Sequence, residues 1–254
     1  MIVVSGSMPK SGSTWLFNMT NHLLTRAGYA DSYELCRRWP LRRVLAGHTC
    51  EFGYPSPGTL LPMLLPWAAG RTFLVRTHFA PSRSLRLLMR AGVVRGTYVY
   101  RDPRDVALSA FNHGERARKG GSFDHQLARL HCIEDAIRYT RDQLLPEWEK
   151  WAQTPGVLTM RYEQLTADPA ASLKRVMDFL GFDIDPGLIG QAVRRYDKRS
   201  LDPAQRRKLL INKGQVGRFR EEMTPAQLRL AQQELGRYLE RMGYERELPA
   251  ESAA

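Results

Sequence analysis

Residues 3–15 of the chain read VVSGSMPKSGSTW, and this stretch decides the fold. Apolar residues come first, a loop rich in Gly and Ser follows, and Trp15 begins a second apolar run. This order predicts a strand, a tight loop and a helix, which together direct backbone N–H groups at an anion. In the usual phosphate loop, G-x-x-x-x-G-K followed by Ser or Thr, the Lys follows the second Gly, whereas here Lys10 precedes Gly12. An ordinary Gly/Ser turn with a solvated Lys is the alternative.

Size and composition fit one globular domain over residues 1–254. The chain is 43% hydrophobic and 25% charged, without an apolar run of membrane-spanning length. Its three cysteines, Cys36, Cys50 and Cys132, lack C-x-x-C spacing, which disfavours a disulfide framework or a zinc site. Because the first predicted core strand follows Met1 directly, we expect no cleaved secretion signal and a reducing, cytoplasmic location.

Short apolar strands alternate with helical patterns along the chain. Further strands are predicted at residues 71–77, 97–101 and 156–161. Helical patterns lie between and after them, at residues 102–119, 122–152, 168–181 and 224–243. The alternation predicts an α/β fold with three layers, in which helices cover both faces of a central, mostly parallel sheet. With the anion loop after the first strand, this architecture is like that of the P-loop NTPases.

Two segments do not follow this alternation. Residues 31–70 contain five prolines and read as irregular, with short helical pieces at most. Residues 198–222 are polar and loop-like. Long loops in a compact domain are often lids or binding segments, so we expect residues 31–70 to form a wall of a binding site. Residues 247–254 read as a disordered tail.

A second polar motif, YVYRDPRDVALS, spans residues 98–109. It places Arg101 at the end of a predicted strand and Ser109 two turns into a predicted helix. A guanidinium beside a helix N-terminus is suited to bind a phosphate. The alternative is a surface Arg101 paired with Asp102 or Asp105. A third motif, INKGQVGR at residues 211–218, is basic and loop-like and is a weak signal by itself.

Taken in chain order, these motifs resemble those of the cytosolic-type sulfotransferases, which use 3′-phosphoadenosine 5′-phosphosulfate (PAPS). PKSGSTW is similar to their 5′-phosphosulfate loop, RDPRDVALS to their 3′-phosphate site and KGQVG to their closing loop. VRTHFAP resembles their strand-end K-T-H motif, and MRYEQLTADPAASLKRVMDFLG their Y-E-x-L segment. The resemblance covers residues 3–227 and implies that the anion is a sulfuryl group joined to a 5′-phosphate.

The resemblance also implies catalytic roles. Lys10 would contact the bridging oxygen and stabilise charge on the departing nucleotide. His78 would remove the proton of the acceptor hydroxyl, a task worth about 10²–10⁴-fold for a general base; a structural His is the alternative. Ser109 is the third catalytic candidate. Because the transferred group arrives already charged on PAPS, no metal is expected.

The remaining matched residues would hold the nucleotide. Trp15 and Tyr162 would contact the adenine, with a plain core aromatic as the alternative for Trp15. The resemblance assigns residues to the two phosphates as follows: Lys10, Ser11, Gly12, Ser13 and Thr14 at the 5′ end, and Arg101, Ser109, Lys213 and Gly214 at the 3′-phosphate.

The sequence departs from the family pattern in three places. Arg76 stands where the family often has Lys, and a planar fork is not a point charge. Asn212 replaces an expected 3′-phosphate Arg, for which Arg218 or Arg220 are the possible substitutes. The family's dimerisation pattern, K-x-x-x-T-V-x-x-x-E, keeps Thr224 but loses its Val and its final Glu. The oligomeric state therefore stays open.

The net charge of +12 fits either a soluble basic surface or a polyanionic partner. A nucleic-acid binder would interleave aromatic and basic residues, and no stretch does so convincingly. A kinase would need a Lys after the second Gly and an acidic strand end for Mg²⁺, and a non-catalytic nucleotide binder would not need Lys10 and His78. We therefore expect a small-molecule acceptor, and neither a nucleic acid nor a membrane as partner.

Aromatic residues of the 31–70 segment suggest that the acceptor is a bulky aromatic or partly anionic alcohol or phenol. These residues are Tyr33, Trp39, Phe52, Tyr54 and Trp67.

Overall fold

The computed structural model describes residues 1–47, 49–121, 126–197, 199–209 and 214–245. Its chain forms two compact units. Unit 1 comprises Met1–Tyr100 and Glu147–Gly214, and unit 2 comprises Arg101–Pro146 and Gln215–Ala254. The organisation of residues 1–254 as one domain stays a prediction.

A parallel four-stranded sheet forms the centre of unit 1. Its strands stand in the order β2-β1-β3-β4, and all pairings between them are parallel. The register places Val4 of β1 opposite Val75 of β2 and Gly96 of β3. The strand bounds are Ile2–Ser7 for β1, Phe73–Thr77 for β2, Val94–Tyr100 for β3 and Val157–Arg161 for β4.

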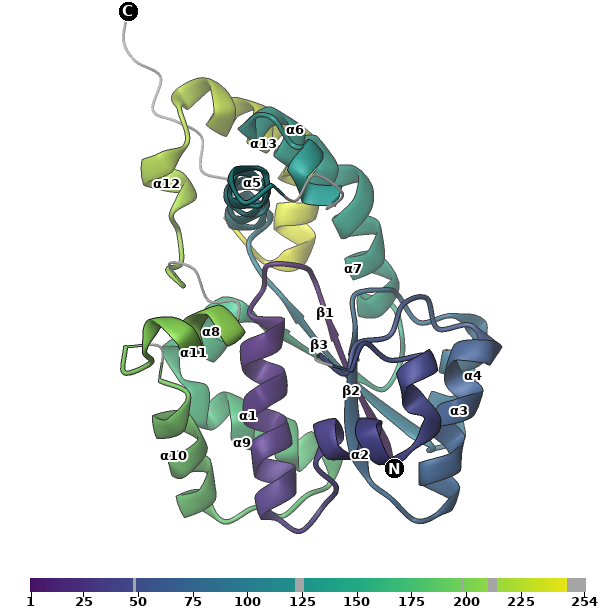
Figure 1. Ribbon diagram of the computed structural model, residues 1–254. Helices are drawn as coiled ribbons and strands as arrows, with labels where there is room; N and C mark the ends of the chain where they lie inside the picture. Colours follow the sequence, from purple (N-terminus) through teal and green to yellow (C-terminus); the bar gives the residue numbers. More distant parts are fainter. Residues whose placement is uncertain (48, 122–125, 198, 210–213, 246–254) are drawn as a thin grey trace, which may run out of the picture. The chain divides into compact units, whose positions relative to one another are not determined.

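Helices cover both faces of this sheet. Figure 1 shows α1, α9 and α10 on one side of it, and α3 and α4 on the other. Every residue of β1 and β2 is buried as a result. The predicted three-layer α/β fold is confirmed. The bounds of these helices are Ser13–Arg26 for α1, Pro57–Ala68 for α3, Arg83–Arg90 for α4, Pro169–Leu180 for α9 and Pro186–Arg195 for α10.

The core of unit 1 brings one helix close to the sheet. A Cβ at Gly6 of β1 would come within 2.5 Å of the Trp151 ring, and the ring also lies against Gly96 of β3. These two glycines therefore make room for the indole, which stacks on Tyr98 at a centroid distance of 5.2 Å. The Trp151 indole N–H donates to the carbonyl of Phe79 at 3.1 Å. The helix α7 (Leu145–Ala152) thus anchors the chain just after β2.

The segment over residues 31–70 is more regular than predicted. It forms α2 (Ser32–Arg38), the 3₁₀ turn η1 (Pro40–Arg43) and α3. Ser56 caps α3 by accepting a hydrogen bond from the Thr59 backbone N–H, and a proline at the first helical position needs no donor. Two further prolines of α3 lie four residues apart, so their missing N–H groups fall on one face. The prediction that the prolines leave this segment irregular, with short helical pieces at most, is therefore wrong for α3.

The predicted helix over residues 122–152 is interrupted. Its described part divides into the 3₁₀ turn η2 (Gln126–Arg129), α6 (Ile133–Tyr139), the π-turn η3 (Thr140–Leu144) and α7. The π-turn ends two residues before Pro146, which has no N–H to donate to the carbonyl four residues earlier, within the turn. Residues 122–125 lie outside the described part.

The other predicted helices of unit 2 are confirmed. Helix α5 (Pro103–Lys119) is capped by Asp102, which accepts from the Arg104 backbone N–H. Helix α13 (Pro225–Met242) begins with a capping box between Thr224 and Gln227 and ends at a left-handed Gly243. Thr224, the one retained residue of the dimerisation pattern, therefore has a role within its own chain.

Short helices complete the described chain. They are α8 (Tyr162–Ala167) and α11 (Pro203–Lys208), both in unit 1, and α12 (Phe219–Glu222) in unit 2. Residues 198–222, predicted as a loop, thus contain two helices where they are described, and residues 198 and 210–213 are not described. The predicted tail at 247–254 also lies outside the described residues. Within the described part, no helix is both long and apolar enough to cross a membrane.

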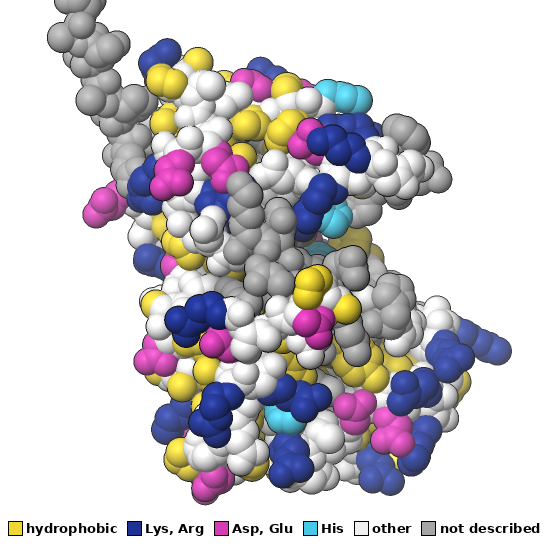
Figure 2. Space-filling model, turned by 60° about the vertical axis from the view of Figure 1, so that its left-hand side comes forward, with side chains coloured by type: hydrophobic (Ala, Val, Ile, Leu, Met, Phe, Trp, Pro, Cys, Tyr) yellow, Lys and Arg dark blue, Asp and Glu magenta, His cyan; other side chains and the backbone are white. Residues whose placement is uncertain are grey.

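Surface charges of both signs are interspersed on the face drawn in Figure 2. Several lysine side chains form ion pairs with a carboxylate one helical turn away on the same helix, such as Lys119 with Glu115 and Lys174 with Asp178. Exposed pairs of this kind are worth about 0.3–0.5 kcal/mol each. These paired residues are therefore solvated helix surface.

Candidate active site

The loop between β1 and α1 is held in a conformation that its sequence requires. Lys10 and Gly12 both have left-handed backbone conformations, with φ of 70° and 76°. Gly12 also lies against Tyr162, since a Cβ at this position would come within 2.6 Å of the ring. A residue other than Gly at position 12 would be strained and would also clash.

The N-terminus of α1 fits a compact anion. Gly12 is its N-cap and supplies no side-chain acceptor, so the first-turn amides, including those of Ser13 and Thr14, have no capping side chain. No acidic residue lies in the first turn. The Ser11 hydroxyl is buried and has no hydrogen-bond partner among the described residues. Unpaired donors of this kind suit a phosphate or sulfuryl oxygen.

His78 lies beside this loop, directly after β2. Its Nδ1 is 2.9 Å from the Ser7 carbonyl oxygen and 3.1 Å from the Ser7 hydroxyl. Because a carbonyl can only accept, Nδ1 carries the hydrogen and the neutral ring keeps its lone pair on Nε2. Burial is the main cause that lowers the pKa of His78, and the charges of Arg76 and Lys10 act in the same direction. The structure therefore brings the predicted base and the predicted loop Lys into one electrostatic environment.

A residue that the sequence analysis missed connects these groups. The carboxylate of Glu51 is 2.9 Å from Nη2 of Arg76 and 3.8 Å from Nε2 of His78. Arg76 is buried, and its Nη1 donates to the Thr14 hydroxyl at 2.6 Å. Arg76, which stands where the family often has Lys, thus contacts Thr14 of the loop with one nitrogen and Glu51 with the other. The single nitrogen of a Lys side chain is less suited to hold two such partners at once.

Trp15 and Tyr162, the two residues predicted at the adenine, are both buried in unit 1. The Tyr162 hydroxyl donates to the Gly214 carbonyl at 3.2 Å, while its ring covers Gly12. The Trp15 indole N–H donates to the Tyr196 carbonyl at 2.8 Å. Trp15 is therefore buried, and its N–H is used within the protein. A contact of either ring with adenine stays a prediction.

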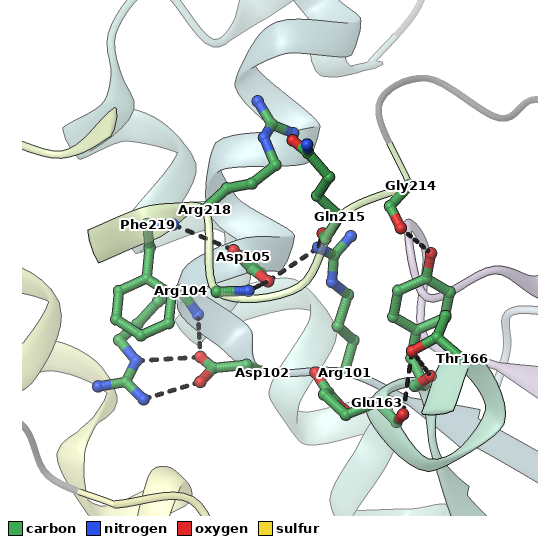
Figure 3. A network of polar contacts seen from close by, with 12 residues as sticks. Arg101, Asp102, Arg104, Asp105, Glu163, Thr166, Gly214, Gln215, Arg218 and Phe219 are labelled. Carbon is green, nitrogen blue, oxygen red and sulfur yellow. Dashed lines mark hydrogen bonds and ion pairs between the residues drawn. The ribbon is translucent and has the colours of Figure 1, made fainter. Parts of the chain in front are cut away.

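In unit 2, Asp105 lies at the centre of the polar network in Figure 3. Its Oδ2 accepts from Nη2 of Arg101 at 2.8 Å and from the Gly217 backbone N–H at 2.7 Å. Its Oδ1 accepts from the Phe219 backbone N–H at 3.2 Å. The same Nη2 of Arg101 donates to the Gln215 carbonyl at 2.5 Å. One carboxylate thus ties residues 215–219 and Arg101 to the first turn of α5.

This network decides between the two readings of Arg101 only in part. The ion pair with Asp105 exists, but Arg101 is 5% exposed and is not a surface residue. Ser109 lies two turns along α5 and is buried as well. Lys213 lies outside the described residues, and Gly214 has a left-handed φ of 70°. The binding of a 3′-phosphate by these residues stays a prediction.

The two possible substitutes for the Arg missing at position 212, itself outside the described residues, differ in their surroundings. Arg218 is buried and forms two hydrogen bonds with the Glu222 carboxylate, at 2.8 and 2.7 Å. Arg220 is exposed, and its guanidinium lies 4.6 Å from the centroid of the Phe219 ring. Arg220 is the better candidate, because a buried bidentate pair is costly to break.

Replacing Asp105 with Ala is expected to lower the free energy of unfolding by about 3–5 kcal/mol. The change leaves the buried Arg101 guanidinium without its carboxylate and two backbone N–H groups without an acceptor. Urea unfolding measures the effect. The matched control is Asp178→Ala, which removes an exposed ion pair of the same i,i+4 spacing. A similar loss in both variants would contradict the central role of Asp105.

The fold is that of an α/β protein in which a Gly/Ser-rich loop joins the first strand to the uncapped N-terminus of the first helix. A family model described as "Sulfotransferase domain" matches residues 2–243, so the chain belongs to this family. This finding confirms the resemblance that the motifs indicate. Cytosolic sulfotransferase 16 of Arabidopsis thaliana is 27% identical over 186 residues, which are 69% of this chain and 52% of that protein. Sulfotransferase 1A1 of Bos taurus is 27% identical over 190 residues, 74% of this chain and 61% of that protein. The chain therefore matches between half and two thirds of the length of these relatives.

Solved structures show the same fold. A mouse sulfotransferase complexed with PAP has a TM-score of 0.59 and 19% identity, covering 94% of this chain and 88% of that one. Retinol dehydratase, in complex with androsterone and the inactive cofactor PAP, has a TM-score of 0.58 and 18% identity, covering 98% of this chain and 82% of that one.

Proposed function

We propose that this chain transfers a sulfuryl group from PAPS to a hydroxyl of a small-molecule acceptor. The observation that carries the proposal is the loop between β1 and α1, with its buried Ser11 hydroxyl and uncapped helix amides, beside a His78 whose Nδ1 lies 2.9 Å from the Ser7 carbonyl oxygen. Family membership and the PAP named with the two solved relatives support the same donor.

We assign residues to each end of such a donor. PAPS would supply the sulfuryl group and the phosphorylated leaving group. Ser11, the backbone at Gly12–Thr14 and Lys10 would hold its 5′ end, and the unpaired Ser11 hydroxyl supports this assignment. Arg101, Ser109, Lys213 and Gly214 would hold the 3′-phosphate, and Tyr162 would contact the adenine.

The proposed mechanism assigns each reacting charge to one side chain. His78 accepts the proton of the acceptor hydroxyl at Nε2, because Nδ1 is already committed to Ser7. Lys10 stabilises the negative charge that develops on the departing oxygen. Ser109, further along α5, is kept as the third catalytic candidate. Positioning and charge stabilisation carry most of the catalysis in transfers of this type.

The acceptor is proposed to be an apolar or aromatic alcohol or phenol. Tyr54 and Phe79 support this, because they are 61% and 46% exposed and meet edge to face at 6.4 Å, with Phe79 next to His78. Solved relatives are named with androsterone and retinol, both apolar alcohols. Phe52, predicted in the acceptor wall, is instead buried in the core, and the Tyr33 hydroxyl donates to Asn18 of α1. A cytoplasmic location and the lack of a metal, nucleic-acid or membrane partner remain expectations.

Adenosine 3′,5′-bisphosphate (PAP) is expected to raise the melting temperature more than AMP at equal concentration. The physical reason is that only PAP carries the 3′-phosphate assigned to Arg101, and a ligand that binds only the folded state stabilises it by mass action. Arg101→Ala should lower the PAP effect selectively. Arg141→Ala, which removes an Arg with its own ion pairs in unit 2, is the control and should leave the ratio of the two shifts unchanged. Equal stabilisation of the wild-type protein by PAP and AMP would contradict the proposed nucleotide.

A further inference from the structure

The backbone of Glu51 is fixed at the edge of the sheet of unit 1. Glu51 forms an isolated parallel bridge with Arg76 of β2. Around it, the Arg76 N–H donates to the Cys50 carbonyl at 3.0 Å, and the Phe52 N–H donates to the Arg76 carbonyl at 3.0 Å. Cys50 holds a left-handed φ of 51°, which turns the chain into this register. Glu51 is therefore held by local pairing and not by a mobile loop contact.

The Glu51 side chain divides its two oxygens between two partners. Oε2 forms the ion pair with Arg76, whose side chain is 5% exposed, and Oε1 faces Nε2 of His78 at 3.8 Å. The distance from Oε1 to Nε2 is too long for a hydrogen bond. Nε2 therefore stays open to the hydroxyl oxygen of the substrate that accepts the sulfuryl group. At this distance an opposite charge still favours the protonated ring.

The charges around His78 oppose one another. Arg76 and Lys10 both disfavour a positive ring, as does burial, while Glu51 and the hydrogen bond to Ser7 favour it. A base that must take up a proton during the reaction needs this compensation, because two neighbouring cations would otherwise oppose the imidazolium. Glu51 supplies the negative charge on the Nε2 side of the ring.

We propose that Glu51 stabilises, through its charge, the imidazolium formed when His78 takes the acceptor's proton. The proton passes from the acceptor O–H to Nε2, and the electron pair of that bond stays on the acceptor oxygen. Through Arg76 and its bond to Thr14, the same carboxylate is connected to the anion loop. The catalytic role of Glu51 rests on the proposed function, whereas its effect on the pKa of His78 can be measured without it.

The test is an NMR titration of His78 in the full chain labelled at its histidine rings. His78→Asn identifies the resonance among the six histidines. Glu51→Gln is expected to lower the pKa of His78 by about one unit, because it removes the opposing negative charge without changing the shape of the side chain. Glu51→Asp should keep most of the pKa, since the charge remains. Lys10→Gln should shift the pKa upward, the opposite sign.

The control variant is Glu34→Gln, which removes another carboxylate paired with an arginine, at an exposed position of α2. It should leave the His78 pKa unchanged. An unchanged pKa in Glu51→Gln, with the other histidine resonances at their wild-type positions, would overturn the inference. In activity, Glu51→Gln should move the acidic limb of kcat/KM to lower pH and lower its plateau. If wild-type protein neither binds PAP nor sulfates any acceptor, the proposed function fails, whereas the titration still decides the role of Glu51.

Discussion

His78→Asn is expected to lower kcat/KM for sulfation of a phenol by about 10²–10⁴-fold, the usual contribution of a general base. Asn is the sharpest replacement, because its amide N–H can keep the bond to the Ser7 carbonyl that Nδ1 makes now, while the proton acceptor Nε2 is lost. The affinity for PAP should stay within a few-fold, because the proposed base contacts the acceptor. Steady-state kinetics and PAP titration measure the two quantities.

The pH dependence provides a second measure of His78. Burial lowers its pKa, so the neutral, active base should persist to lower pH than for an ordinary histidine. Wild-type kcat/KM should therefore fall only when the pH falls through this lowered pKa, and His78→Asn should lose that limb. The deficit of the variant should also shrink with acidic phenols, which are already partly ionised. A deficit that is independent of phenol acidity would show that His78 is structural.

The anion loop could be predicted from the sequence because its determinants are contiguous. Gly12 permits a left-handed turn, the apolar residues on each side predict a strand and a helix, and Lys10 is unusual between them. Helix caps such as Asp102 and Thr224 are equally local. Local structure of this kind depends on a few neighbouring residues, and the strand, the turn and the helix starts agree with it, whereas anion binding by the loop stays a prediction.

Contacts between distant segments could not be predicted in the same way. Glu51 reaches His78 because a nonhelical segment pairs with the edge of β2, and no periodicity marks that register. The i,i+4 pair of Arg101 and Asp105 follows from helix geometry, but the hydrogen bond of Asp105 with Gly217 joins residues 112 positions apart. Trp15 illustrates the same limit, since only the packed structure provides its carbonyl partner.

Lys10→Met is expected to lower turnover with PAPS by about 10²–10³-fold, the scale on which one transition-state charge donor acts. Met keeps much of the length of the side chain and removes only the ammonium. The reason for the loss is that negative charge on the departing nucleotide oxygen would no longer be stabilised. Lys174→Met, which removes an exposed Lys of α9, is the control and should be neutral.

The leaving-group role of Lys10 predicts how this deficit changes with the donor. With a nitrophenyl sulfate donor, the departing phenolate is stable by itself, so the Lys10→Met deficit in kcat/KM should shrink towards the control. The His78→Asn deficit should not change with the donor and should respond only to the acidity of the acceptor. Because each substitution relieves only one of the two charges, the variants separate the two ends of the reaction. If both variants respond alike to both changes, Lys10 and His78 do not divide the work between leaving group and acceptor.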